Sequence, residues 1–174
     1  EIRLSLVGSE MCIRDRLTIA RHPSETDERM MVRILAFVLH AHEALSFGKG
    51  LSTDDEPDLW QKDLTGAIEL WIDVGQPDEK RIMKACGRSN QVMIYSYSSM
   101  SNIWWNQIAS KVDRAKNLSV FNLPAATSQA LAKLAQRSMQ LQCTIQDGQV
   151  WINGEGESIQ IDLVQLKAPA DAAR

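Results

Sequence analysis

The sequence predicts an α/β fold in which helices pack against the faces of a mixed β-sheet. Three strand-like segments, 67–74, 91–97 and 117–123, alternate with helix-like segments, which is the arrangement of βαβ crossovers. The segment 139–153 has two alternating runs around Asp147-Gly148, and this pattern predicts a type I′ hairpin. We expect this C-terminal hairpin to add antiparallel strands at one edge of the sheet.

A long helix is expected before the first of these strands. Pro23 ends a short β-like run over 17–20, and Ser24 with Asp27 three residues later resembles the capping box of a helix start. Apolar side chains then recur at spacings of three and four for about six turns. The stripe consists of Met31, Ile34, Leu35, Val38, Ala41, His42 and Leu45.

Three shorter helices and a last strand complete the expected fold. Pro77 followed by two acids is typical of a helix start and predicts a helix over 78–88. Apolar periodicity predicts further helices over 100–115 and 125–137. A last alternating strand is expected over 159–166.

Length and composition indicate one globular domain. The 174 residues are 44% hydrophobic and 24% charged, enough to bury a sizeable core. A net charge of −3 argues against a protein that coats nucleic acid non-specifically, although it permits a local basic groove. No run approaches the about 18 apolar residues of a membrane span, so we expect no membrane partner. The three cysteines are isolated, which favours free thiols in a reducing cytoplasm, and the oligomeric state is left open.

The strand over 67–74 carries acids among its apolar residues. One face carries Ile68, Leu70 and Ile72, and the other carries Glu69, Trp71 and Asp73. Burying an ionised carboxylate is costly unless a cation lies beside it. More acids precede the strand at 54–58, and the following helix carries Lys80, Lys84 and Arg88. The region therefore has acids and cations that the fold can bring together.

These groups could form a metal-dependent phosphodiesterase site. Mg²⁺ prefers oxygen ligands and keeps several waters, so Asp58 and Asp73 with a substrate phosphate would suffice. The chain between them is long enough for a strand, a turn and a returning strand. Lys84 lies between the apolar Met83 and Ala85, so we expect a partly buried amine that assists the attacking water. The alternative is a solvated acidic edge that pairs with a basic helix face.

Other catalytic motifs are absent from the sequence. Gly48-Lys49-Gly50 lacks the order glycine, lysine, serine or threonine that a phosphate loop requires. The histidines do not form the HExxH pattern of zinc proteases. His22 could contact phosphate, but its position before a helix favours a hydrogen-bonding role at the helix entry.

Several blocks of the sequence together resemble the YaeQ family of small bacterial proteins. They are ARHPSETDERMM (20–31), DDEPDLW (54–60), ELWIDVG (69–75), PDE (77–79), IWW (103–105) and TIQDG (144–148). The resemblance runs from about Leu17 to Leu166. Residues 1–16 are instead similar to a translated sequencing adapter, so we expect them to be non-native. We expect one domain over 17–168 and a disordered tail over 169–174.

The resemblance implies the fold of the PD-(D/E)XK nuclease superfamily. Such a restriction-endonuclease-like core has a helix, three strands, a second helix and a further strand. The metal ligands would be Asp58 of the proline-aspartate pair, Asp73, and Glu28 (or Glu25) on the first helix. They would hold Mg²⁺ or Mn²⁺, and nucleic acid would be the substrate.

The chain departs from the superfamily pattern at Gly75, which stands where the motif lysine belongs. Either Lys84 supplies the amine from the following helix or the site is inactive. The sequence therefore leaves two functional hypotheses, a metal-dependent nuclease and an inactive nucleic-acid- or protein-binding regulatory module on the same fold. A third interpretation is that the acids are structural polar groups.

Overall fold

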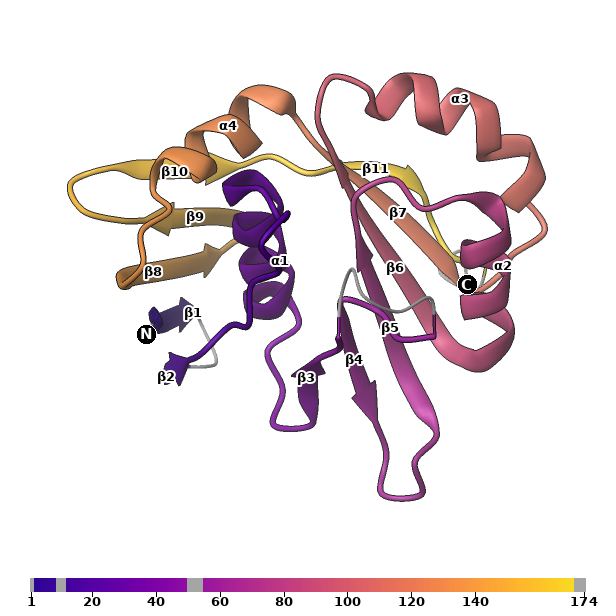
Figure 1. The fold of residues 1–174 in the computed structure, drawn as a ribbon, viewed down its shortest axis with the longest axis horizontal. Helices are drawn as coiled ribbons and strands as arrows, with labels where there is room; N and C mark the ends of the chain where they lie inside the picture. Colours follow the sequence, from indigo (N-terminus) through magenta and orange to yellow (C-terminus); the bar gives the residue numbers. More distant parts are fainter. Residues whose placement is uncertain (1, 9–11, 50–54, 171–174) are drawn as a thin grey trace.

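The computed structural model describes residues 2–8, 12–49 and 55–170 (Figure 1). Its strands are β1 (Ile2–Gly8), β2 (Cys12–Leu17), β3 (Leu45–Phe47), β4 (Leu59–Lys62), β5 (Ile68–Val74), β6 (Ser89–Tyr97), β7 (Leu118–Leu123), β8 (Met139–Gln146), β9 (Gln149–Asn153), β10 (Ser158–Ile161) and β11 (Val164–Lys167). Its helices are α1 (Asp27–Leu39), α2 (Glu79–Arg88), α3 (Ser101–Val112) and α4 (Ala125–Lys133). Asp54 of the acidic cluster and positions 171–174 of the expected tail lie outside the described residues.

The strands form two sheets in the described part of the chain. One has the order β10-β9-β8-β1-β2, and the other has the order β11-β7-β6-β5-β4-β3. In the second sheet β3, β4 and β5 are antiparallel neighbours, whereas β5, β6 and β7 run parallel. The carboxyl ends of β5, β6 and β7 therefore meet at one edge, which is where α/β sheets position ligand-binding groups.

Helices α1 and α4 lie between the two sheets, and α2 and α3 cover the opposite face of the second sheet (Figure 1). The core around α1 gathers apolar residues from both sheets. The core under α2 and α3 gathers Trp71, Ile82, Ile94 and Trp104 among others. Every residue of α1 from Met30 to Ala36 is buried, because the helix is enclosed on both sides.

The expectation of a single sheet is wrong. The hairpin of β8 and β9 does not extend the central sheet, since β8 pairs in parallel with β1 to form the first sheet. The expected strand over 159–166 is divided into β10 and β11, which belong to different sheets. The turn between β8 and β9 is confirmed, with positive φ values of 53° at Asp147 and 76° at Gly148.

The first helix is shorter than the sequence pattern predicts. Thr26, rather than Ser24, caps its start by accepting a hydrogen bond from Arg29 N at 3.2 Å. The helix ends at Leu39, and Leu45 of the expected stripe belongs to β3 instead. The run over 17–20 is not a strand beyond Leu17. Along the chain α1 is followed by the antiparallel β3, β4 and β5, then by α2 and by β6, which is parallel to β5.

Among the described residues there is no helix with the length and apolar character needed to cross a bilayer.

A histidine at the end of α1 makes stability depend on pH. His40 Nε2 lies 2.5 Å from the Tyr95 hydroxyl, and burial lowers the pKa of His40 to about 4. The folded state binds this proton less readily than the unfolded chain, whose histidine has a pKa of about 6.5. The stabilisation is therefore present above about pH 6.5 and is lost as the pH falls towards about 4.

We expect the native chain to lose about 2 kcal/mol more unfolding free energy than His40→Gln between about pH 7.5 and about pH 5. Urea titrations of both proteins at the two pH values measure the difference. Equal losses in the two proteins would contradict a neutral buried imidazole.

Candidate functional site

The register of β4 and β5 brings the two predicted aspartates together. Leu59 pairs with Ile72, so Asp58, the residue before β4, lies at the level of Asp73. Val74 N donates to Asp58 Oδ2 at 2.8 Å, which fixes the loop before β4 against the end of β5. Both aspartates are buried, with exposed fractions of 3% and 2%. The register therefore places Asp58 and Asp73 opposite each other at the end of β5.

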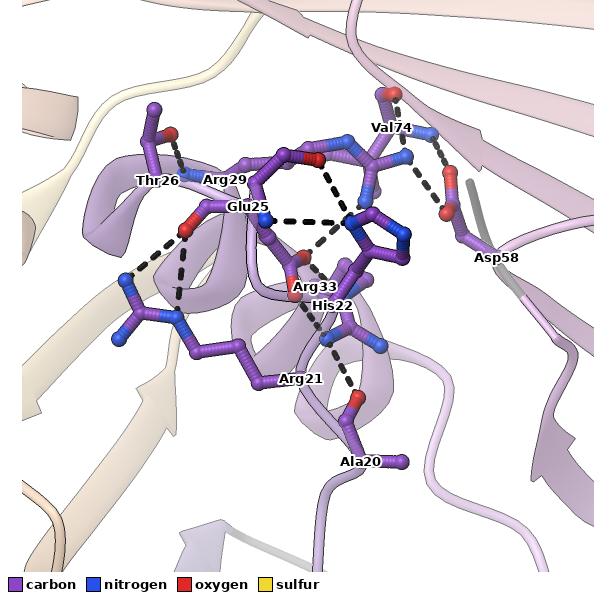
Figure 2. A network of polar contacts seen from close by, with 10 residues as sticks. Ala20, Arg21, His22, Glu25, Thr26, Arg29, Arg33, Asp58 and Val74 are labelled. Atoms are coloured by element: carbon purple, nitrogen blue, oxygen red, sulfur yellow. Dashed lines mark hydrogen bonds and ion pairs between the residues drawn. The ribbon is translucent and has the colours of Figure 1, made fainter. Parts of the chain in front are cut away.

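An arginine from α1 occupies the free side of Asp58. Arg29 Nη2 lies 2.6 Å from Asp58 Oδ1, and Arg29 Nη1 lies 3.1 Å from Glu25 Oε1 (Figure 2). Burial raises the pKa of Asp58, and the neighbouring Asp73 carboxylate adds to the rise, while Arg29 opposes it. For Arg29 burial acts to lower the pKa, but Asp58 and Glu25 outweigh it and raise the value. The guanidinium therefore remains charged.

A second arginine, from α2, holds Asp73. Arg81 Nε lies 2.9 Å from Asp73 Oδ2, and Arg81 Nη2 lies 3.0 Å from Asp73 Oδ1. This is the two-point geometry in which guanidinium and carboxylate groups bind most strongly. Trp71 Nε1 also donates to Asp73 Oδ2 at 3.1 Å. Arg81 further donates to the Glu56 carbonyl at 3.0 Å, which ties α2 to the loop before Asp58.

The ion pairs continue through Glu25 into α1 (Figure 2). Arg33 Nε and Nη2 each lie 2.7 Å from a different carboxylate oxygen of Glu25. Both side chains are almost completely buried, at 4% and 2% exposure. Arg21 donates to the Glu25 carbonyl from Nε and Nη2. His22 accepts from Ser24 N at 3.1 Å, so it has the helix-entry role that the sequence favoured.

Lys84 does not join the aspartates. Its ammonium lies 2.7 Å from Asp55 Oδ1, in a pair whose side chains are 50% and 78% exposed. The prediction of a partly buried amine is wrong, because Ala85 turns inward while Lys84, one helix position earlier, faces solvent. The cations that contact the aspartates are the guanidinium groups of Arg29 and Arg81.

Glu28 also has a different partner. Its Oε1 accepts a hydrogen bond from Ser128 Oγ at 2.6 Å, which joins α1 to α4. Ser128 is completely buried. Glu25, which the resemblance gave as the alternative acid, is the one connected to Asp58, through Arg29. Its carboxylate contacts Arg29 and Arg33.

Gly75 has a backbone conformation that side chains rarely adopt. Its φ is +106°, and its N–H donates to the Tyr95 carbonyl at 2.8 Å. No atom lies within 4 Å of a Cβ built at this position, so the restriction lies in the backbone and not in space. A lysine at position 75 would be strained in this turn.

Three arginines of the site were not predicted. Arg29 and Arg33 follow Glu25 at intervals of four, a spacing that places charges on one helix face and could have indicated the pairing. Arg81 has no comparable signal, because its partner Asp73 lies on another element.

The donor set does not fit a divalent metal ion. All four carboxylate oxygens of Asp58 and Asp73 already accept hydrogen bonds from Arg29, Val74, Arg81 or Trp71. Within residues 2–8, 12–49 and 55–170, no group of three or more histidine, cysteine or acidic side chains is arranged to hold a metal. The arrangement resembles a closed set of buried ion pairs.

Comparison with known proteins places this chain in a family. The family model described as YaeQ protein matches residues 1–163 of the chain. The chain belongs to the YaeQ family. It is 44% identical to the YaeQ protein of Salmonella typhi and 43% identical to that of Escherichia coli (strain K12), in each case over 88% of this chain and 86% of the relative.

Solved YaeQ structures have the same fold. The crystal structure of the YaeQ protein from Xanthomonas axonopodis pv. citri matches with a TM-score of 0.89 at 45% identity, covering 96% of this chain and 97% of that one. The YaeQ protein from Pseudomonas syringae matches with a TM-score of 0.92 at 33% identity, covering 97% and 95%. The two-sheet architecture thus agrees with experimental structures of the YaeQ family.

Proposed function

We propose that this YaeQ-family chain is a catalytically inactive binding module on a PD-(D/E)XK nuclease-type fold. It would bind nucleic acid or protein in the cytoplasm without cutting a phosphodiester. The order of α1, the antiparallel β3–β5, α2 and the parallel β6 supports the fold assignment, together with the convergence of Asp58 and Asp73.

The observation that carries the proposal is the pairing of both aspartates with arginine. Two guanidinium groups supply the positive charge that a divalent ion would otherwise bring to these carboxylates. An ion entering the pocket would have to displace buried, charge-assisted hydrogen bonds. Arginine stays protonated at any working pH, so it cannot accept the proton of an attacking water.

A cleavage assay tests this proposal. Labelled single- and double-stranded DNA and RNA are incubated with the protein and Mg²⁺ or Mn²⁺, and with Asp73→Asn as the matched variant. We expect no cleavage by either protein beyond that of the buffer. Cleavage by the native chain that Asp73→Asn abolishes would overturn the proposal.

The second candidate is the metal-dependent nuclease, which the adjacency of Asp58 and Asp73 favours. Here Mg²⁺ or Mn²⁺ would displace Arg29 and Arg81 when substrate binds. The same assay decides between the two functions.

Gly75 gives a separate prediction. Gly75→Lys places the motif lysine in the superfamily position, and we expect it to lower the unfolding free energy by about 1–3 kcal/mol because φ is positive there. We also expect no gain of cleavage, since both aspartates stay paired. Gly87→Ala in α2 is the control. That position has open space, so we expect the variant to gain about 0.4–1 kcal/mol. If urea titration shows that Gly75→Lys is as stable as the native chain, the backbone strain expected at position 75 is contradicted.

A further inference from the structure

An unbroken row of cations and aromatic rings crosses the face of the second sheet beside the acid pair. The Arg88 guanidinium lies 5.4 Å from the centre of the Trp71 ring. Trp71 meets Trp60 edge to face at 6.3 Å, and the Lys62 ammonium lies 3.7 Å from the centre of the Trp60 ring. We name these four residues, together with Lys84 one helical turn before Arg88, the Trp60 strip.

The outer members of this strip are accessible. Lys62, Lys84 and Arg88 are exposed, and Trp60 is half-buried. Trp71 is buried in the core and contacts Trp60 from there. Lys84 and Arg88 are one helical turn apart on α2, so they point the same way. The strip therefore has three exposed cations, of which Lys62 contacts the half-buried indole of Trp60 and Arg88 the buried indole of Trp71.

The acid that pairs with the two cations of α2 is held only at the surface. Asp55 binds Lys84 through its side chain and Arg88 through its carbonyl, and it is itself 78% exposed. Such exposed pairs contribute little and exchange readily with other anions. A ligand that carries both negative charge and flat rings would replace Asp55 at Lys84 and Arg88, and would replace Lys62 at the face of the Trp60 ring.

We propose that the Trp60 strip binds single-stranded nucleic acid. Phosphates would contact Lys62, Lys84 and Arg88, and a base would stack on Trp60. Cationic grooves with stacking aromatic side chains are the common way in which proteins hold single strands without sequence preference. An acidic protein segment would match the charges but would leave the indole without a flat partner. This inference names the partner in the proposed function. It rests on that function in one respect, which is that the chain binds its partner without cutting it.

Fluorescence anisotropy with labelled oligothymidylate and oligouridylate tests this inference at low ionic strength. A chelator is present, so that cleavage cannot occur. We expect saturable binding. The logarithm of the association constant should fall linearly with the logarithm of the salt concentration, with a slope of about −2, because this is the value for three phosphate contacts on a single strand. Trp60→Leu should weaken binding by about tenfold through lost stacking. Lys62→Glu should weaken it by a similar factor, since it removes one phosphate contact and adds a repulsive charge.

The matched control is Lys133→Glu, an equal charge change at an exposed position on α4, away from α2 (Figure 1). It should bind within about twofold of the native chain, because Lys133 contacts no phosphate in the proposed complex. Absence of binding, or equal losses in Lys62→Glu and Lys133→Glu, would overturn the proposal. Equal affinity of Trp60→Leu and the native chain for the oligonucleotide, with heparin displacing it, would also overturn the proposal. The surface would then bind polyanions in general. Cleavage in the assay above would refute the proposed function but would leave this binding result standing.

Discussion

Glu25→Gln is expected to lower the unfolding free energy by about 3–5 kcal/mol. The substitution keeps the size of the side chain but removes the charge that Arg33 contacts at two points and Arg29 at one. The buried Arg33 would then lose the carboxylate that it contacts, while Arg29 would keep Asp58 as a partner. Urea unfolding followed by circular dichroism measures the loss.

Two variants define the cause of this effect. Asp27→Asn breaks the exposed pair with Arg21, whose side chains are 53% and 42% exposed, and should change stability by about 0.5 kcal/mol or less. The double variant Glu25→Gln/Arg33→Met should recover part of the loss, because it removes an unpaired buried charge. A Glu25→Gln protein as stable as Asp27→Asn would contradict the role given to the buried pairs.

Arg81→Met is expected to cost about 3 kcal/mol and to create a response to divalent ions. It leaves the buried Asp73 carboxylate with the Trp71 indole as the side-chain donor shown in the described residues. If Arg81 takes the place of a metal ion, Mn²⁺ should raise the melting temperature of the variant and leave that of the native chain unchanged. Differential scanning fluorimetry with and without Mn²⁺ tests both statements.

Lys84→Met is the matched control for Arg81→Met. It removes a cation from the same helix, but that cation pairs with the exposed Asp55 and not with Asp73. We expect little loss of stability and no response to Mn²⁺. An equal Mn²⁺ response in both variants would show that the ion binds elsewhere and would contradict the substitution of metal by Arg81.

The local elements of the fold could be predicted, but their assembly could not. Strand β5 is confirmed, and Leu70 and Ile72 face one core while Trp71 faces the other. Ile68, expected on the face of Leu70, packs instead against the core that contains Trp71. The apolar stripe predicted that α1 continues to Leu45, and this prediction was wrong for a physical reason. Leu45 is buried in the same core from strand β3, so its apolar character carries no information on where the helix ends.

The first sheet, β10-β9-β8-β1-β2, was missed because alternation shows which residues are buried and not against which partner. The strand β8 pairs with β1, a segment that the sequence led us to set aside as foreign. That residues 1–16 are non-native stays a prediction. In the structure Ile2–Gly8 pair with β8, and Cys12–Leu17 pair with β1.

Asp58 and Asp73 are the members of the candidate site that the sequence indicated. Asp58 and Asp73 could be paired because a strand, a turn and a returning strand bring the two ends together. The cation could not be chosen, since Lys84 and Arg81 are on one helix and only the orientation of α2 decides which of them faces Asp73.

Calorimetric titration of Mn²⁺ into the native chain tests the central claim most directly, with Asp73→Asn as its matched control. If guanidinium groups occupy the aspartates, the two titrations should be the same and should show no stoichiometric binding heat. A heat of binding at one ion per chain that disappears in Asp73→Asn would contradict the account, because the carboxylates would then prefer the metal ion to Arg29 and Arg81.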